Sequence, residues 1–126
     1  LVHALAYPIG GEYHVNHGKS LAPIMLACFR SIMVAKKYRF AQIASAIGEN
    51  VDGLSEREAA ELCLDALKDM LIKLNLPTCL SDLGIEKDEA KVEQWAVDAH
   101  AEQRLLSRCA RKLSVNDIKN IYLDAF

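Results

Sequence analysis

The chain has 126 residues, of which 52% are hydrophobic and 25% are charged, so it can bury one core and does not have the composition of a disordered segment. Its 15 basic and 17 acidic residues give a net charge of −2 and form no basic stripe, which argues against nucleic-acid binding. The longest apolar stretch, 21–35, is interrupted by Arg30 and is too short to span a membrane.

The first 17 residues contain three of the four histidines, namely His3, His14 and His17. Pro8 predicts the end of a helix that includes His3, and Gly10-Gly11 predicts a tight reversal of the chain after it. The next helix would then fold back and bring His17 towards His3, and imidazole pairs brought together in this way are common metal ligands. The spacing alone also allows histidines on a solvated face, and two imidazoles fill only half of a tetrahedral site.

Hydrophobic residues that recur every three to four positions predict helices along the rest of the chain. The expected helices cover about 20–35, 37–47, 56–75 and 88–106, with a last one that begins after Ser114. No sustained alternation of apolar and polar residues predicts a strand. We therefore expect one all-α domain of five or six helices over residues 1–126.

Local signals add detail to these helices. Ser55 and Ser114 each precede an acidic residue by three positions, which is the spacing of a capping box at a helix start. In the helix expected over 37–47, Gly48 is the C-terminal cap and four apolar residues turn inward. These four are Phe40, Ile43, Ala44 and Ile47.

The four cysteines are widely spaced and form no Cys-x-x-Cys pair. Cys28 and Cys63 fall on expected apolar faces, which predicts buried thiols in a reducing compartment such as the cytoplasm. An extracellular domain with two disulfides is the alternative. The chain begins at Leu1 without a methionine and opens like the interior of a helix, so we expect a fragment or a processed product.

The segment from His3 to Gly18, HALAYPIGGEYHVNHG, resembles the second signature of the iron-containing (group III) alcohol dehydrogenases. That signature has two metal-binding histidines 14 positions apart, the second followed by glycine, and His3 and His17 match both. The likeness continues along nearly the whole chain through Ala41-Gln42-Ile43-Ala44, Gly53-Leu54-Ser55, Leu76-Pro77 and Leu113-Ser114-Val115-Asn116-Asp117-Ile118.

The resemblance implies the helical C-terminal half of a two-domain, dehydroquinate synthase-like enzyme, whose N-terminal nucleotide-binding domain holds most of the NAD or NADP. It implies a four-ligand divalent metal site, usually iron and sometimes zinc, to which His3 and His17 contribute two ligands. The implied reaction is reversible hydride transfer between a nicotinamide and a small alcohol or aldehyde, in a homo-oligomer. The other ligands, in an Asp-x-x-x-His segment, and the Gly-Gly-Gly-Ser phosphate loop do not occur in these 126 residues. We therefore expect the chain alone to be inactive.

Two positions depart from the family pattern. Many members have histidine where this chain has Tyr7, one helical turn after His3 and so expected beside the metal as a catalytic residue. A phenol can donate a hydrogen bond there but is a poorer proton shuttle near neutral pH than an imidazole. Cys109-Ala110-Arg111 stands in place of Asn-Pro-Arg, and this match puts Leu105 near the substrate. The alternative function is a non-catalytic helical interaction domain that carries a relic of the metal motif.

Overall fold

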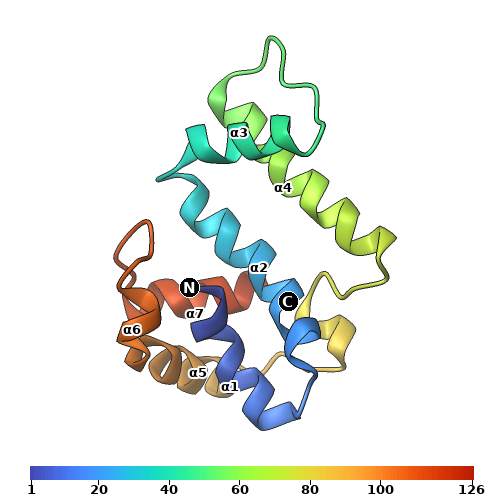
Figure 1. Cartoon of the computed structure of the whole chain (residues 1–126). Coiled ribbons are helices and arrows are strands. Elements are labelled where there is room, and N and C mark those ends of the chain that lie inside the picture. Colours follow the sequence, from blue (N-terminus) through green and yellow to red (C-terminus); the bar gives the residue numbers. More distant parts are fainter.

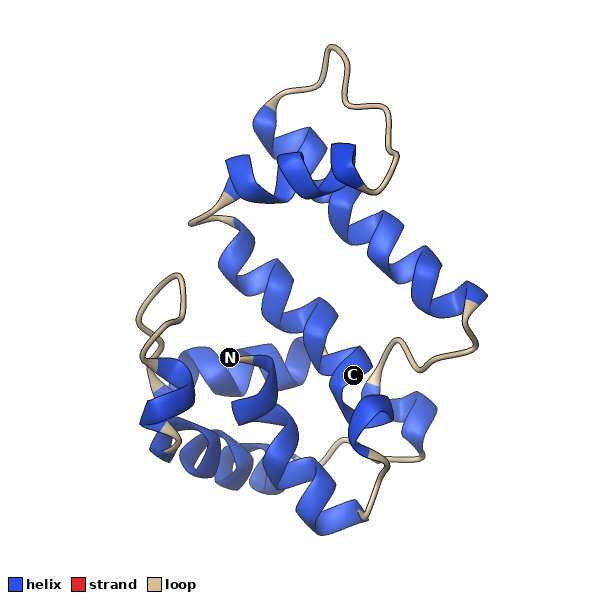
Figure 2. Cartoon of the chain, viewed as in Figure 1, coloured by secondary structure: helices blue, strands red, loops and turns tan.

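The computed structural model describes residues 1–126 as seven α-helices and one short 3₁₀ helix, with no strand (Figures 1 and 2). The expected all-α domain is confirmed, with one helix more than the five or six expected. In chain order the elements are α1 (Val2–Tyr13), α2 (His17–Met33), α3 (Lys37–Ala46), α4 (Glu56–Lys73), the 3₁₀ helix η1 (Leu80–Leu83), α5 (Glu89–Ala101), α6 (Gln103–Leu106) and α7 (Val115–Asp124).

Helix α2 connects two lobes of unequal size (Figure 1). The larger lobe contains α1, η1, α5, α6, α7 and the first half of α2, around a cluster of 16 buried apolar residues. The smaller lobe contains α3, α4 and the end of α2, around six buried residues. Since burial of apolar area is the main stabilising contribution to folding, most of it lies in the larger lobe.

The core of the larger lobe joins the two ends of the chain. Leu5 and Ile9 of α1 are fully buried in the same cluster as Trp95 of α5 and Tyr122 of α7. Ile118 of α7 is fully buried beside them. The first helix is therefore held in place by the last part of the chain as well as by its neighbour α2.

The capping boxes form as expected. The hydroxyl of Ser55 accepts a hydrogen bond from the Glu58 amide at 3.3 Å, and the hydroxyl of Ser114 accepts one from the Asp117 amide at 3.1 Å. In both boxes the acidic side chain accepts a hydrogen bond from the serine backbone amide, so amides that the helix leaves free find partners.

Two expectations about the helices are wrong. The helix expected over 88–106 is interrupted at Glu102, where ψ is 54° and the backbone leaves the α region. Ile43 and Ile47 of α3 do not turn inward but are 41% and 38% exposed. Helix α3 is only ten residues long, and Phe40 and Ala44 are its only buried residues, so its contact with the lobe is too narrow to cover the two isoleucines.

The cysteines are all free thiols, and Cys28 and Cys63 are fully buried, as expected. Burial raises the pKa of the Cys28 thiol to about 12 and also raises the pKa of Cys63, so neither forms a thiolate readily at neutral pH. None of the helices combines the length and the apolar character needed to cross a membrane.

Candidate metal centre

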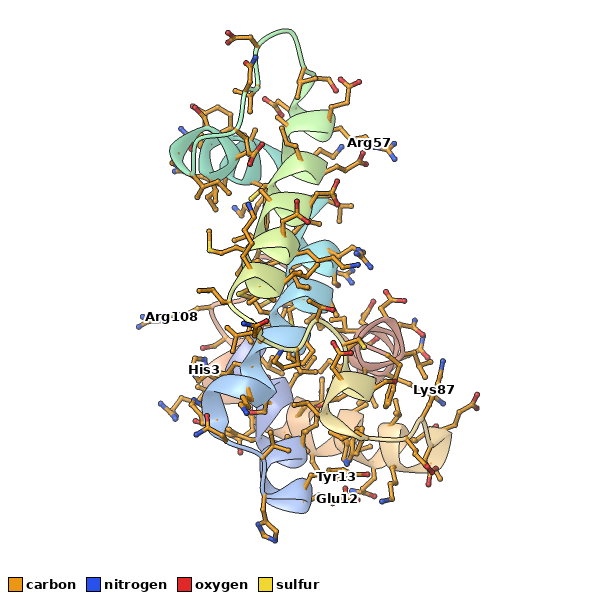
Figure 3. All side chains as sticks on the ribbon, turned by 90° about the vertical axis from the view of Figure 1, so that its right-hand side faces the viewer. His3, Glu12, Tyr13, Arg57, Lys87 and Arg108 are labelled. Carbon is orange, nitrogen blue, oxygen red and sulfur yellow. The ribbon has the colours of Figure 1, made fainter.

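The structure brings two of the three N-terminal histidines together. His3 lies in the first turn of α1 and His17 is the first residue of α2. Their ring centroids are 5.4 Å apart, with 44° between the ring planes, and both side chains are exposed. His3 lies on the flank of the larger lobe (Figure 3). A pair of imidazoles on adjacent helices, open on one side, is a suitable donor set for a divalent metal.

The path of the chain between these histidines differs from the one expected. Pro8 does not end the first helix, and Gly10-Gly11 makes no reversal, because α1 continues through both to Tyr13. A proline in a helix removes one backbone hydrogen bond, and here burial of Leu5 and Ile9 on the flanking turns offsets that loss. The chain reverses instead over 14–16.

His14 ends α1 in the left-handed conformation, with φ of 51°. This conformation turns the chain out of the helix, and only glycine adopts it without steric cost. Asn16 then caps α2, its side-chain oxygen accepting a hydrogen bond from the Gly18 amide at 3.1 Å. The Ser20 hydroxyl donates a hydrogen bond to the His17 carbonyl at 2.9 Å, so the first turn of α2 is fixed next to its exposed imidazole.

Tyr7 lies on α1 one turn after His3 and is 46% exposed. It lines a surface hollow of about 290 Å³ together with Gly10, Gly11 and His17. Because the two glycines carry no side chain, the surface beside Tyr7 and His17 is concave. Tyr7 and His17 therefore border the same hollow, as the sequence predicts for residues that share a site.

The chain by itself provides two ligands of a metal site. No group of three or more histidine, cysteine, aspartate or glutamate side chains is arranged to hold an ion. His3 and His17 fit two positions of a tetrahedral or octahedral site and leave the other positions open. The donor set therefore fits half of the centre that the resemblance implies.

Leu105 is not among the residues that line the hollow beside His17. It lies on α6, a four-residue helix packed against α1, and is partly buried against the main core. Its predicted contact with substrate is therefore not represented by a shared cavity in this chain. His14 is exposed in the turn, apart from the ring pair, and His100 borders a different hollow with Cys109, Arg111 and Lys112.

The far end of α1 is attached to α5 through Glu12, a residue that the sequence alone did not single out. One carboxylate oxygen of Glu12 accepts a hydrogen bond from the Trp95 indole at 2.8 Å, and the other pairs with the Lys91 ammonium at 2.6 Å. These hydrogen bonds, that of Lys91 first, lower the pKa of the Glu12 carboxyl. Glu12 and Tyr13 lie together at the lower end of α1 (Figure 3), and Lys91 also stands over the Tyr13 ring, 5.2 Å from its centroid.

Comparison with known proteins decides the family. The model of the C-terminal part of the Fe-containing alcohol dehydrogenase family matches residues 1–126. The chain belongs to this family. The resemblance seen in the segment from His3 to Gly18 is therefore confirmed, and it extends over the whole sequence.

Several family members are similar to this chain over almost its full length. Long-chain-alcohol dehydrogenase 1 of Geobacillus thermodenitrificans is 38% identical over 125 residues, which is 99% of this chain and 31% of that protein. The 1,3-propanediol dehydrogenase of Citrobacter freundii is 35% identical over 125 residues, 99% of this chain and 32% of that protein. The chain thus spans about a third of the length of these relatives.

Solved structures of the family have the same fold. A 1,3-propanediol oxidoreductase matches with a TM-score of 0.91 and 32% identity, over 99% of this chain and 32% of that one. An alcohol dehydrogenase from Oenococcus oeni matches with the same values. The helical arrangement of Figure 1 is therefore the arrangement of the C-terminal domain in this family.

Proposed function

We propose that this chain is the C-terminal, metal-binding part of a metal-dependent, NAD(P)-linked alcohol dehydrogenase. The observation that carries the proposal is the His3–His17 ring pair, 5.4 Å between centroids, in a chain that is similar from end to end to alcohol and diol dehydrogenases. The reaction proposed is reversible hydride transfer between a nicotinamide and a small alcohol or aldehyde.

Each of the candidate residues has a distinct role in this proposal. His3 and His17 hold a divalent metal, iron or zinc, with their neutral imidazoles. A metal bound there acts as a Lewis acid on the substrate oxygen. Tyr7, on the exposed face beside the pair, donates a hydrogen bond to that oxygen, and Leu105 provides an apolar contact for the substrate.

The rest of the proposed enzyme is a nucleotide-binding domain that precedes this chain and supplies two further metal ligands. Similarity to about a third of each relative supports this division. The chain alone then lacks the dinucleotide site and should show no NAD(P)-linked turnover of a small alcohol. The proposed enzyme works in the cytoplasm as a homo-oligomer, for which the free buried thiols Cys28 and Cys63 support a reducing compartment.

The first test is to sequence the coding region upstream of Leu1 and express the longer protein. The proposal expects a glycine-rich phosphate loop and an Asp-x-x-x-His segment there, and alcohol oxidation that depends on added Fe²⁺ or Zn²⁺. His3→Ala and His17→Ala should each abolish that activity, whereas His14→Ala should leave it unchanged. An initiator codon directly before Leu1, or full activity of both alanine variants, would refute the proposal.

A second candidate is the non-catalytic interaction domain. Exposed apolar side chains on α3 and α4 favour it, because an uncovered apolar surface is typical of a protein interface. These are Tyr38, Ile43, Ile47, Met70, Ile72 and Leu74. A longer protein that binds a partner through this lobe, and shows neither metal binding nor hydride transfer, would establish this function in place of the first.

A further inference from the structure

Helix α1 has two faces with opposite environments. At about 100° per residue, Leu5 and Ile9 share one face, and both are fully buried. His3 and Tyr7 lie on the opposite face and are exposed. The helix thus points its candidate ligand away from the core, and the position of that ligand depends on what holds the inner face.

Pro8 interrupts the backbone hydrogen bonding of α1. It has no amide hydrogen, so the carbonyl of Ala4 loses its usual donor within the helix. The next carbonyl, that of Leu5, accepts a buried hydrogen bond from the hydroxyl of Tyr122, with 2.6 Å between the oxygens. Helix α7 is therefore bonded to α1 midway between His3 and Tyr7.

Tyr122 is itself tightly held. Its side chain is fully buried, and its ring packs edge-on against Trp95 with 5.7 Å between centroids. Burial raises the pKa of Tyr122, so its hydroxyl remains a protonated donor throughout the neutral range. Trp95 in turn donates to Glu12 at the other end of α1. The two aromatic side chains thus attach α1 to α7 and α5 at points about two turns apart.

The same helix α7 packs against α2, which carries His17. Ile24 and Cys28 of α2 are fully buried in one cluster with Tyr122 and Leu5. Helix α7 therefore contacts both helices that present the histidines, and a change in its bond to α1 moves His3 relative to His17.

We propose that Tyr122 is a positioning residue for the His3–His17 pair: its hydrogen bond to the Leu5 carbonyl sets where the first turn of α1 presents His3 opposite His17. The proposal rests on the proposed function in taking this pair to hold a divalent metal. The effect on ring geometry is independent of that assumption.

The test is the Tyr122→Phe variant, which removes only the hydroxyl and keeps the ring. Two quantities are measured by NMR in the chain with and without this change: the ring-to-ring nuclear Overhauser effect between His3 and His17, and the Zn²⁺ affinity from the ring resonances during titration. We expect the Overhauser effect to be lost and the Zn²⁺ affinity to fall about tenfold, at unchanged helical circular dichroism.

Phe40→Leu is the matched control, because Phe40 is buried in the smaller lobe and does not belong to the core that contains α1. It should lower thermal stability and leave both NMR quantities as in the parent chain. A tenfold loss of Zn²⁺ affinity in this control as well would show that the effect of Tyr122→Phe is general destabilisation and would overturn the proposal.

Other outcomes separate the two proposals. A Tyr122→Phe chain with the parent Overhauser effect and the parent Zn²⁺ affinity overturns the role of Tyr122. A parent chain that binds no Zn²⁺ through the pair refutes the metal function, and the loss or persistence of the Overhauser effect still decides the role of Tyr122. Should Tyr122→Phe not fold, the comparison is made between Pro8→Ala and Pro8→Ala/Tyr122→Phe, since alanine strengthens the helix without restoring the hydroxyl.

Discussion

Trp95 donates its indole hydrogen to the carboxylate of Glu12 at 2.8 Å, across 83 positions of sequence. The same carboxylate pairs with Lys91 on α5. A charged group thus joins the C-terminal end of α1 to α5 at the edge of the core, where it accepts one hydrogen bond from a buried aromatic side chain and one from an exposed ammonium.

This arrangement makes part of the stability depend on pH. The hydrogen bonds from Lys91 and Trp95 lower the pKa of Glu12 below its ordinary 4.5, so their stabilising effect is complete above about pH 4.5 and is lost as the pH falls through the lower, folded-state pKa. Glu12→Gln should therefore lower the urea midpoint at pH 7, and the difference from the parent chain should shrink in acid. Glu61→Gln, in an exposed pair with Arg57, should change the midpoint little at either pH. Equal midpoints for the parent and Glu12→Gln at pH 7 would contradict this.

The turn between α1 and α2 should be open to stabilisation. His14 is held at φ 51°, where a side chain crowds the backbone and glycine does not. His14→Gly should raise the free energy of unfolding by about 0.5–1 kcal/mol, after the loss of chain entropy that glycine brings. His14→Ala keeps the Cβ and should give no such gain. Urea unfolding of the three chains measures the difference, and a destabilised glycine variant would show that the His14 ring makes a contact that outweighs the strain.

Two glycines provide a paired test of backbone conformation. Gly11 is helical and an added Cβ would meet nothing within 4 Å, so Gly11→Ala should stabilise the chain by about 0.5–1 kcal/mol. Gly48 also has open space, but its φ is +100°, so Gly48→Ala should destabilise it by a similar or larger amount. Opposite shifts of the thermal midpoint are expected. Shifts of the same sign would mean that space, and not backbone conformation, determines the effect at one of the two positions.

The exposed face of α1 allows a direct test of the candidate centre. Histidines four positions apart on a helix can chelate one metal ion, so Tyr7→His would place a second imidazole beside His3. We expect Zn²⁺ binding to tighten about tenfold, the gain of one good ligand interaction. Tyr38→His, on α3 of the smaller lobe, should leave the affinity unchanged. Unchanged Zn²⁺ affinity in Tyr7→His would show that position 7 does not face the ion.

Features with a local cause could be predicted from the sequence. The capping boxes at Ser55 and Ser114 depend on residues three positions apart, and both formed. The pairing of His3 with His17 was also expected, although by a reversal at Gly10-Gly11 that does not exist. The chain turns at His14 instead.

Features that depend on contacts between distant segments could not be predicted in this way. Continuation of α1 through Pro8 depends on the burial of Leu5 and Ile9 by helices far along the chain. Neither the Trp95–Glu12 bond nor the Tyr122–Leu5 bond leaves any signal in periodicity or spacing. The exposure of Ile43 reflects how little of α3 its neighbours cover, which a hydrophobic pattern does not report.

The bond from Tyr122 to Leu5 spans 117 positions, and this has a consequence for biosynthesis. A ribosome releases α1 and its two histidines long before α5 and α7, so in the nascent chain the inner face of α1 has no cover. Closing so long a loop is slow compared with forming the individual helices. The two imidazoles therefore reach their final separation only after α7 has been released, and a metal ion that arrives earlier meets two independent histidines.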